Sequence, residues 1–240
     1  MATAWLLSKN GYNVIITGRR SDRLAELKRS ITSKTEALVQ TLCFDIRDNK
    51  QVCNALASLP EEWKKIDVLI NNAGLASGLD QLHNGDVEDW DKMIDTNVKG
   101  LLYVSRQIIP QMIAQKSGHI VNIGSIAGKE VYPNGNVYCG TKHMVDALNL
   151  SMRRELAEHN IKVSAVNPGA VETEFSLVRL HGDAEKAHKV YDGFENLVAE
   201  DIADAVHYVI SRPDHVNIND IIIMPKAQPA AGQVIRNKGL

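Results

Sequence analysis

The stretch Tyr138-Cys139-Gly140-Thr141-Lys142 opens a long helical pattern and places a phenol and an ammonium group four positions apart. On a helix, residues at i and i+4 lie on the same face, one turn from each other. A phenol ordinarily titrates near 10, and an ammonium held close to it stabilises the phenolate and lowers its pKa. Ser125, which follows a strand-like run, can hold a substrate oxygen beside that phenol. Together these groups can move a proton to or from an alcohol or carbonyl oxygen.

Six short apolar runs alternate with helical patterns along the chain. They cover residues 12–17, 38–44, 67–71, 120–123, 161–167 and 221–224. Such alternation is typical of βαβ units with parallel strands and right-handed crossovers. We therefore predict one α/β domain over residues 1–240, with a Rossmann-like doubly wound parallel sheet between two layers of helices. The polar, mixed residues 172–197 are expected to form a lid over the substrate.

The composition is that of an ordinary soluble protein, and the length fits one large α/β domain. The chain has 240 residues, 44% hydrophobic and 23% charged, with a formal net charge of -2. That charge gives no support to nucleic acid or an anionic membrane surface as a partner. No apolar run reaches the roughly 18 residues of a membrane span, and no secretory leader opens the chain. We therefore expect neither a nucleic acid nor a membrane partner.

Cys43, Cys53 and Cys139 are odd in number and have no regular spacing. This pattern indicates free thiols in a reducing compartment, and neither a disulfide framework nor a metal site. The expected location is the cytoplasm.

Polar or turn-forming residues follow five of the predicted strands. They are Arg19, Arg20, Asp45, Asn72, Ser125 and the pair Pro168-Gly169. In an open parallel sheet, ligands bind at the carboxyl ends of the strands. The sequence therefore predicts a ligand site along this edge.

Several of these residues also carry a family resemblance, which covers nearly the whole chain. Asn71-Asn72-Ala73-Gly74, Asn97, Ser125, Tyr138-x-x-x-Lys142 and Pro168-Gly169 occur in the order and spacing of the short-chain dehydrogenases/reductases. Within that family the chain resembles the NADP-dependent 3-hydroxy acid dehydrogenases that act on serine and L-allo-threonine. The stretches that resemble this subgroup are 62–63, 87–90, 135–138, 173–176 and 215–219.

The resemblance implies roles for four catalytic residues. Tyr138 is expected to exchange a proton with the substrate oxygen, to which Ser125 hydrogen-bonds. Lys142 is expected to lower the tyrosine pKa and to hold the nicotinamide ribose, and Asn97 to keep a water in the proton relay. The family likeness also implies a homotetramer packed through helices 98–115 and 138–159.

The expected cofactor is NADP. Arg19 and Arg20 follow the strand that ends at the adenine ribose in such sheets, and guanidinium groups suit a 2′-phosphate. An enzyme specific for NAD would place an acidic side chain there. The resemblance further implies that Asp45 and Ile46 flank the adenine and that Asn72 lies on the adenosine ribose side.

The resemblance implies that residues 168–173 pass the nicotinamide. The cofactor-binding residues expected there are Pro168, Gly169, Val171 and Thr173, with Thr173 near the diphosphate or carboxamide.

The expected function is interconversion of a hydroxyl and a carbonyl on a small polar substrate, a 3-hydroxy acid such as serine or L-allo-threonine. A carboxylate substrate requires a cation in the pocket, and Arg179 or Lys226 are the candidates. Two alternatives remain open: a reductase of other small carbonyls, such as a diketone or an aldehyde, and a truncated, non-catalytic paralogue.

The family begins with a strand and a glycine-rich turn that binds the cofactor diphosphate, and this chain shows neither. We expect the chain to be an incomplete version of a protein longer by roughly 15–20 residues. In the family's sheet order the missing strand is central, so the strands at 12–17 and 67–71 would face a gap. The flanking strands could instead close up, or another chain could supply the strand.

Overall fold

The computed structural model describes residues 1–236, in which strands and helices alternate as predicted. The strands are β1 (Val14–Gly18), β2 (Val39–Cys43), β3 (Val68–Asn71), β4 (Gly118–Ile123), β5 (Ile161–Pro168) and β6 (Asp220–Ile223). Each overlaps one of the six runs expected to form strands. All six strands contain β-branched residues such as Val and Ile, which favour the extended conformation.

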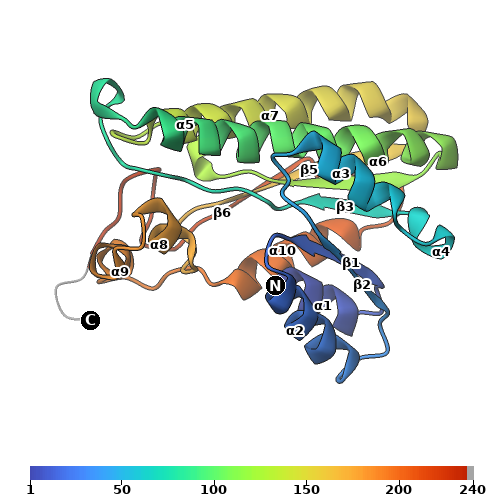
Figure 1. Ribbon diagram of the computed structural model, residues 1–240. Helices are drawn as coiled ribbons and strands as arrows, with labels where there is room; N and C mark the ends of the chain where they lie inside the picture. Colours follow the sequence, from blue (N-terminus) through green and yellow to red (C-terminus); the bar gives the residue numbers. More distant parts are fainter. Residues whose placement is uncertain (237–240) are drawn as a thin grey trace.

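The helices form two layers, one on each side of the strands (Figure 1). They are α1 (Ala2–Lys9), α2 (Ser21–Thr32), α3 (Asn49–Ala57), α4 (Glu61–Lys64), α5 (Val87–Ile94), α6 (Leu101–Gln115), α7 (Asn136–Leu156), α8 (Phe175–Arg179), α9 (Ala184–Tyr191) and α10 (Ala199–Ile210). The π-helical turn η2 (Asp95–Gly100) joins α5 to α6. Helices α3, α5, α6 and α7 lie on one face, and α1, α2 and α10 lie on the other. The predicted three-layer Rossmann-like architecture is confirmed.

The parallel sheet is divided into two parts. β1 pairs only with β2, whereas β3, β4, β5 and β6 pair in that order, all in parallel. The prediction that the first and third strands face a gap is confirmed, because β1 and β3 are edge strands of separate sheets. The two strands have not closed up into one smaller sheet.

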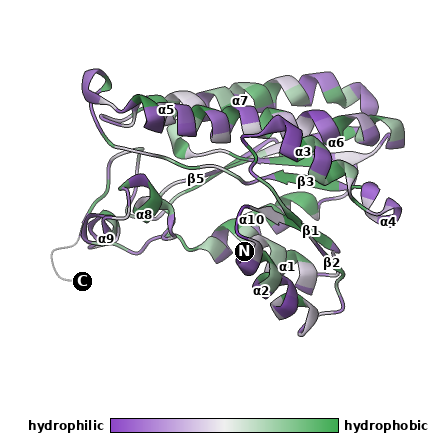
Figure 2. Ribbon diagram, in the orientation of Figure 1, coloured by the Kyte–Doolittle hydropathy of each residue, from purple (hydrophilic) through white to green (hydrophobic). Residues whose placement is uncertain are grey.

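Side-chain packing joins the two sheets where backbone pairing does not. A cluster next to α10 contains Val14 and Ile16 of β1, Val121 of β4, Val166 of β5 and Val206 of α10. A second cluster on the opposite face contains Leu42 of β2, Phe44, Ile120 of β4 and Val163 of β5. Figure 2 shows this hydrophobic interior between the layers and hydrophilic residues on the outer turns of α2 and α5. Burial of such surface contributes about 25 cal/mol per Å².

A buried histidine lies within the four-stranded sheet. His119 in β4 is 4% exposed, and its Nε2 is 2.8 Å from the Ser164 Oγ of β5. Burial, assisted by the charge of Lys162, lowers the pKa of His119 to about 4. Its ordinary value is about 6.5, so the unfolded chain binds a proton at this position at a higher pH than the folded chain does.

We predict that His119 makes the protein less stable as the pH falls from 6.5 to 4. In that window the unfolded state binds a proton at His119 that the folded state does not bind. The free energy of unfolding therefore falls by about 2–3 kcal/mol. Urea unfolding at a series of pH values should show a flatter pH dependence for His119→Gln than for the parent chain. The exposed His215 provides the control, since His215→Gln should leave the slope unchanged. Equal slopes for the parent and His119→Gln would contradict the prediction.

Candidate active site

The carboxyl end of β4 delivers Ser125 to the edge of the sheet. Ser125 is buried, and its Oγ accepts a hydrogen bond from the Ala127 backbone N–H at 3.1 Å. Its own backbone N–H donates to Asn167 Oδ1 on β5, at 3.2 Å. A Cβ at the preceding Gly124 would overlap that same oxygen. Glycine is therefore needed there so that Asn167 can fix the backbone of Ser125.

Tyr138 lies in the first turn of α7, is 8% exposed, and meets the Phe175 ring edge-on with centroids 5.7 Å apart. Burial raises the pKa of the Tyr138 phenol above its ordinary range. A hydrogen bond from the Ser125 side chain and the positive charge of Arg179 act in the opposite direction without reversing the shift. The phenol is therefore protonated at neutral pH, the state that holds a proton to give, while its raised pKa makes it a weaker acid.

Lys142 is not among the groups that shift the Tyr138 pKa in this structure, so its expected effect on the phenol stays a prediction. The Lys142 Nζ donates a hydrogen bond to the backbone carbonyl of Ile123 on β4, at 2.9 Å. Lys142 is itself buried, and burial lowers its pKa to about 8. The cation that acts on the phenol is Arg179 instead. Removal of both Tyr138 and Lys142 from water disfavours the charged form of each.

Asn97 lies in the π-helical turn η2 and is 2% exposed. Its Oδ1 accepts from the Leu75 backbone N–H, and its Nδ2 donates to the Leu75 carbonyl, both at 2.8 Å. The same Nδ2 also donates to Thr141 Oγ1 on α7, at 3.0 Å. The expected role of Asn97 in holding a water stays a prediction; its side chain here fixes the segment that follows β3. π-helical turns often occur at functional sites.

Asn97 and Lys142 come together beside Gly74, whose Cβ, if present, would lie 3.4 Å from both Asn97 Oδ1 and Lys142 Nζ. The structure thus places the Ser125 side chain beside the Tyr138 phenol, and the side chains of Asn97 and Lys142 both beside Gly74.

A network of buried amides supports this edge, and of its members the sequence had indicated only Asn71. Asn71 Nδ2 donates to Ser105 Oγ at 3.0 Å and to Asn122 Oδ1 at 2.9 Å. Asn122 Nδ2 in turn donates to Asn149 Oδ1 at 2.9 Å. The network joins β3, β4, α6 and α7. Polar groups of this kind need partners when buried, so each amide fixes the next.

The predicted 2′-phosphate residues are exposed and already bind carboxylates. Arg20 Nη2 lies 3.2 Å from Glu174 Oε2, and Arg23 Nη1 lies 2.7 Å from Glu174 Oε1. Arg19 is 4.0 Å from Asp45 Oδ2. Arg23 was missed because it lies one turn into α2, away from the end of β1. Its position in the first turn of α2, only three residues after the N-cap Arg20, is the signal that could have identified it.

Asp45 is held chiefly by Arg47, whose Nη2 is 2.6 Å from Asp45 Oδ2. Hydrogen bonds from Arg47 lower the pKa of the Asp45 carboxyl. Ile46 packs against Gly100 of η2, where a Cβ would lie 2.9 Å from Ile46 Cγ1. Asn72 is exposed just beyond β3, and its backbone N–H donates to the Ile70 carbonyl. Asp45, Ile46 and Asn72 thus follow β2 and β3 along the same edge.

The remaining predicted cofactor residues run from the end of β5 into the lid. Pro168 is buried, and the Gly169 N–H donates to the Ile223 carbonyl of β6 at 2.8 Å. The Val171 carbonyl accepts from the Tyr191 hydroxyl of α9 at 3.0 Å. Thr173 is exposed, and its Oγ1 accepts from the Phe175 N–H at 3.2 Å.

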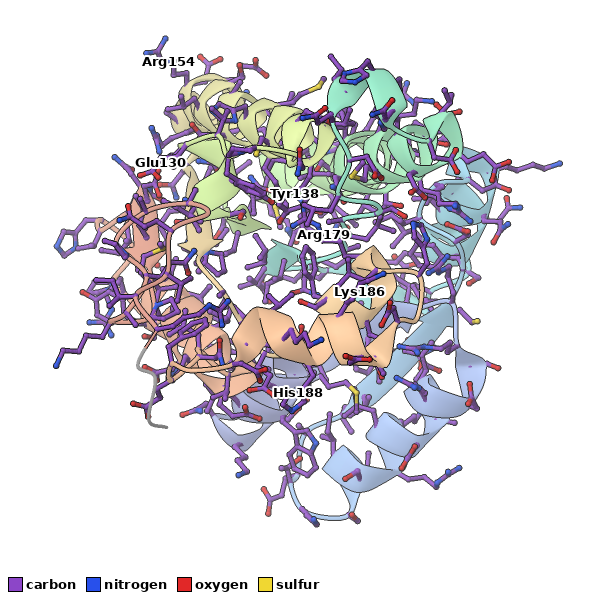
Figure 3. The ribbon with its side chains drawn as sticks, turned by 90° about the vertical axis from the view of Figure 1, so that its left-hand side faces the viewer. Glu130, Tyr138, Arg154, Arg179, Lys186 and His188 are labelled. Atoms are coloured by element: carbon purple, nitrogen blue, oxygen red, sulfur yellow. The ribbon has the colours of Figure 1, made fainter. Side chains whose placement is uncertain are left out.

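Arg179 is the lid residue that reaches Tyr138. Its guanidinium carbon is 5.6 Å from the centre of the Tyr138 ring, and its Nη1 donates to the Tyr132 hydroxyl at 2.9 Å. Its Nη2 is buried and has no hydrogen-bond partner among the described residues. Figure 3 shows Arg179 and Tyr138 next to each other. Lys226, the other candidate cation, is exposed and outside the pocket that Arg179 and Tyr138 line.

A small pocket lies beside Tyr138 and Arg179. Its walls are formed by residues 77–80, 85–86, 89–90, 93, 134–136, 138 and 179, and its volume is about 10 Å³. That is about the space one water molecule needs.

Residues 1–236 contain no cluster of three or more His, Cys, Asp or Glu side chains that could hold a metal ion. No helix in the same residues is long and apolar enough to cross a membrane. Cys43, Cys53 and Cys139 are all free thiols.

Comparisons with known proteins agree with this geometry. A family model described as short chain dehydrogenase matches residues 1–181. A probable NADP-dependent dehydrogenase of Haemophilus influenzae is 48% identical over 230 residues, 95% of this chain and 90% of the relative. An NADP-dependent 3-hydroxy acid dehydrogenase of Salmonella typhi is 47% identical over 225 residues, 93% of this chain and 89% of the relative.

A solved structure, the closed form of a serine dehydrogenase complexed with NADP+, superposes with a TM-score of 0.91 at 43% identity. The match covers 99% of this chain and 94% of that one. Both the family match and these identities extend over most of the sequence. The chain belongs to the short-chain dehydrogenase family.

Proposed function

We propose that this protein is an NADP-dependent dehydrogenase that interconverts the hydroxyl and the carbonyl of a small 3-hydroxy acid such as serine or L-allo-threonine. The observation that carries the proposal is the guanidinium of Arg179, which lies across the Tyr138 ring with its Nη2 buried and unpaired. A buried, unpaired donor of this kind is suited to a carboxylate. The names of the relatives, an NADP-dependent 3-hydroxy acid dehydrogenase and a serine dehydrogenase, agree with it.

The reaction divides among residues that the fold brings together. Tyr138 gives its proton to the substrate oxygen when a carbonyl is reduced and takes it back when an alcohol is oxidised. Its raised pKa, which is due to burial, favours the protonated state from which reduction begins. Ser125 hydrogen-bonds the same oxygen, and Arg179 holds the carboxylate at the other end of the substrate. NADP supplies or accepts the hydride.

The residues present fit NADP. Arg20 and Arg23 converge on the two oxygens of Glu174, which supports the proposal that they can converge on an anionic group such as a phosphate. Guanidinium pairs bind phosphate in the same bidentate way. We infer that Arg19, Arg20 and Arg23 hold the 2′-phosphate, that Asp45, Ile46 and Asn72 line the adenosine end, and that Lys142 holds the nicotinamide ribose. Pro168, Gly169, Val171 and Thr173 would border the nicotinamide and diphosphate.

We also propose that the protein is a cytoplasmic homotetramer. Three free thiols suit a reducing compartment. Met144 and Leu150 of α7 are 46% and 40% exposed, which leaves apolar surface for another copy to cover. The proposed contact uses α6 and α7.

Tyr138→Phe should lower kcat by about 10²–10⁴-fold, because it removes only the proton-transferring hydroxyl. The dissociation constant for NADP, measured by titration calorimetry, should stay within about twofold of the parent value. Tyr208→Phe on the exposed face of α10 is the control. If the Tyr138→Phe variant kept a tenth of the parent kcat, the proton-transfer role would be wrong.

Arg179→Met should raise KM for serine by about 30- to 100-fold, the effect of losing a charge-assisted hydrogen bond of about 2–3 kcal/mol. KM for serine methyl ester, which lacks the carboxylate charge, should change by less than about threefold. Lys226→Met should affect neither substrate. An equal change for acid and ester would mean that Arg179 does not bind the carboxylate.

Replacement of Arg19 and Arg20 by Ala should weaken NADP binding much more than NAD binding, since only NADP has the 2′-phosphate. We expect a loss of at least about 30-fold for NADP and less than about threefold for NAD. Arg29→Ala, on the exposed last turn of α2, is the matched control. A loss of the same size for both nucleotides would contradict the assignment.

A further inference from the structure

One buried carboxylate near the pocket has no part in the proposed chemistry. Asp89 belongs to the stretch 87–90, which the sequence singled out, and lies in the first turn of α5. It is only 3% exposed. Acidic side chains are seldom so buried unless they are paired, so its partners indicate what it does.

Asp89 joins three separate segments. Its Oδ1 accepts a hydrogen bond from Ser77 Oγ at 2.7 Å and lies 3.3 Å from Lys92 Nζ. Its Oδ2 lies 3.1 Å from the Nε2 of His181, which follows the lid helix α8. Burial raises the pKa of Asp89, but hydrogen bonds from Ser77 and Lys92 and the charge of His181 outweigh that effect and lower it. The side chain therefore holds its partners as an anion.

The loop that Ser77 begins is held from its other side by Arg179. The Gly78 N–H donates to the Arg179 carbonyl at 2.9 Å, and Arg179 Nε donates to the Gly78 carbonyl at 3.3 Å. Gly78 has φ +73°, and a Cβ there would lie 2.9 Å from Asp89 Oδ2. Glycine is needed for both reasons. Asp89 and Arg179 thus contact the loop from opposite sides.

His181 reaches Asp89 because the chain reverses direction after α8. His181 has φ 54°, in the left-handed region that residues with side chains seldom adopt. The neighbouring N–H groups of His181 and Gly182 donate to the Val178 and Leu177 carbonyls and close the end of the helix. The same end of α8 carries Arg179, so a contact at His181 also fixes the base of the Arg179 side chain.

We propose that Asp89 is a positioning residue for Arg179: together with Ser77 and His181 it latches the lid so that the guanidinium stays over Tyr138. The latch thereby sets the preference of the enzyme for acid over neutral substrates. This effect on preference rests on the proposed carboxylate-binding role of Arg179, whereas the latch itself does not. Asp89 acts through the lid without contacting the reacting atoms.

The kinetic test compares Asp89→Asn with Asp91→Asn, a matched change at an exposed position two residues along α5. Asp89→Asn should raise KM for serine at least tenfold, with kcat and the KM for serine methyl ester changed by less than threefold. Asp91→Asn should change none of these values. In an Arg179→Met background, Asp89→Asn should alter the acid-to-ester preference by less than twofold, because both changes remove the same interaction.

A second measurement follows the latch without catalysis. Hydrogen exchange at the Gly78 amide, whose acceptor is the Arg179 carbonyl, should be at least tenfold faster in Asp89→Asn and in His181→Gln. His181→Lys places an ammonium group beside Asp89 and should exchange at the parent rate. The His181 side chain is 59% exposed, so its variants test the latch even if Asp89→Asn folds poorly.

Unchanged exchange in both Asp89→Asn and His181→Gln would overturn the latch. Faster exchange with an unchanged preference for the acid would overturn the positioning role of Asp89. If Arg179→Met also left that preference unchanged, the carboxylate-binding role proposed for Arg179 would fail separately.

Discussion

The site depends on the hydrogen bonding of one residue's backbone N–H and C=O by one side chain. The carboxamide of Asn97 both accepts from and donates to the backbone of Leu75. Because Asn97 is almost completely buried, water cannot replace either bond. This contact fixes the chain just after β3. It thereby places Gly74 against Lys142 on one side and leads Ser77 and Gly78 toward the lid on the other.

Burial also shifts pKa values in the site, and it acts in opposite directions on Tyr138 and Lys142 of α7. It raises the pKa of Tyr138 and lowers that of Lys142, so each is shifted toward its neutral form. The guanidinium of Arg179 partly opposes the first shift. A cation from α8 thus acts on the acidity of a phenol in α7.

Features that depend on local pattern could be predicted from the sequence. The apolar, β-branched runs gave the six strands, and the polar residues that follow them, such as Ser125, do lie at one edge. The separation of β1 from β3 was also predictable, because the family's sheet order places between them a strand that this sequence does not show. Features that depend on packing between distant parts of the chain could not be predicted from the sequence. The spacing of Tyr138 and Lys142 suggested a lowered phenol pKa, but burial cannot be judged from spacing. Nothing local in sequence indicates that Glu174 meets Arg20 and Arg23, or that Asp89 meets His181.

The division of the sheet has a mechanical consequence. Across the boundary between β1 and β3 the described chain is joined by apolar side chains and, at the carboxyl edge, by the ion pairs of Arg20 and Arg23 with Glu174. Apolar contacts are non-directional and permit small sliding displacements, whereas a ladder of backbone hydrogen bonds does not. Exposed ion pairs contribute little to stability, but they can act as a tether that limits such sliding. The two-stranded part is therefore held to the four-stranded part by contacts that resist separation more than sliding, and the ion pairs with Glu174 oppose sliding at the carboxyl edge.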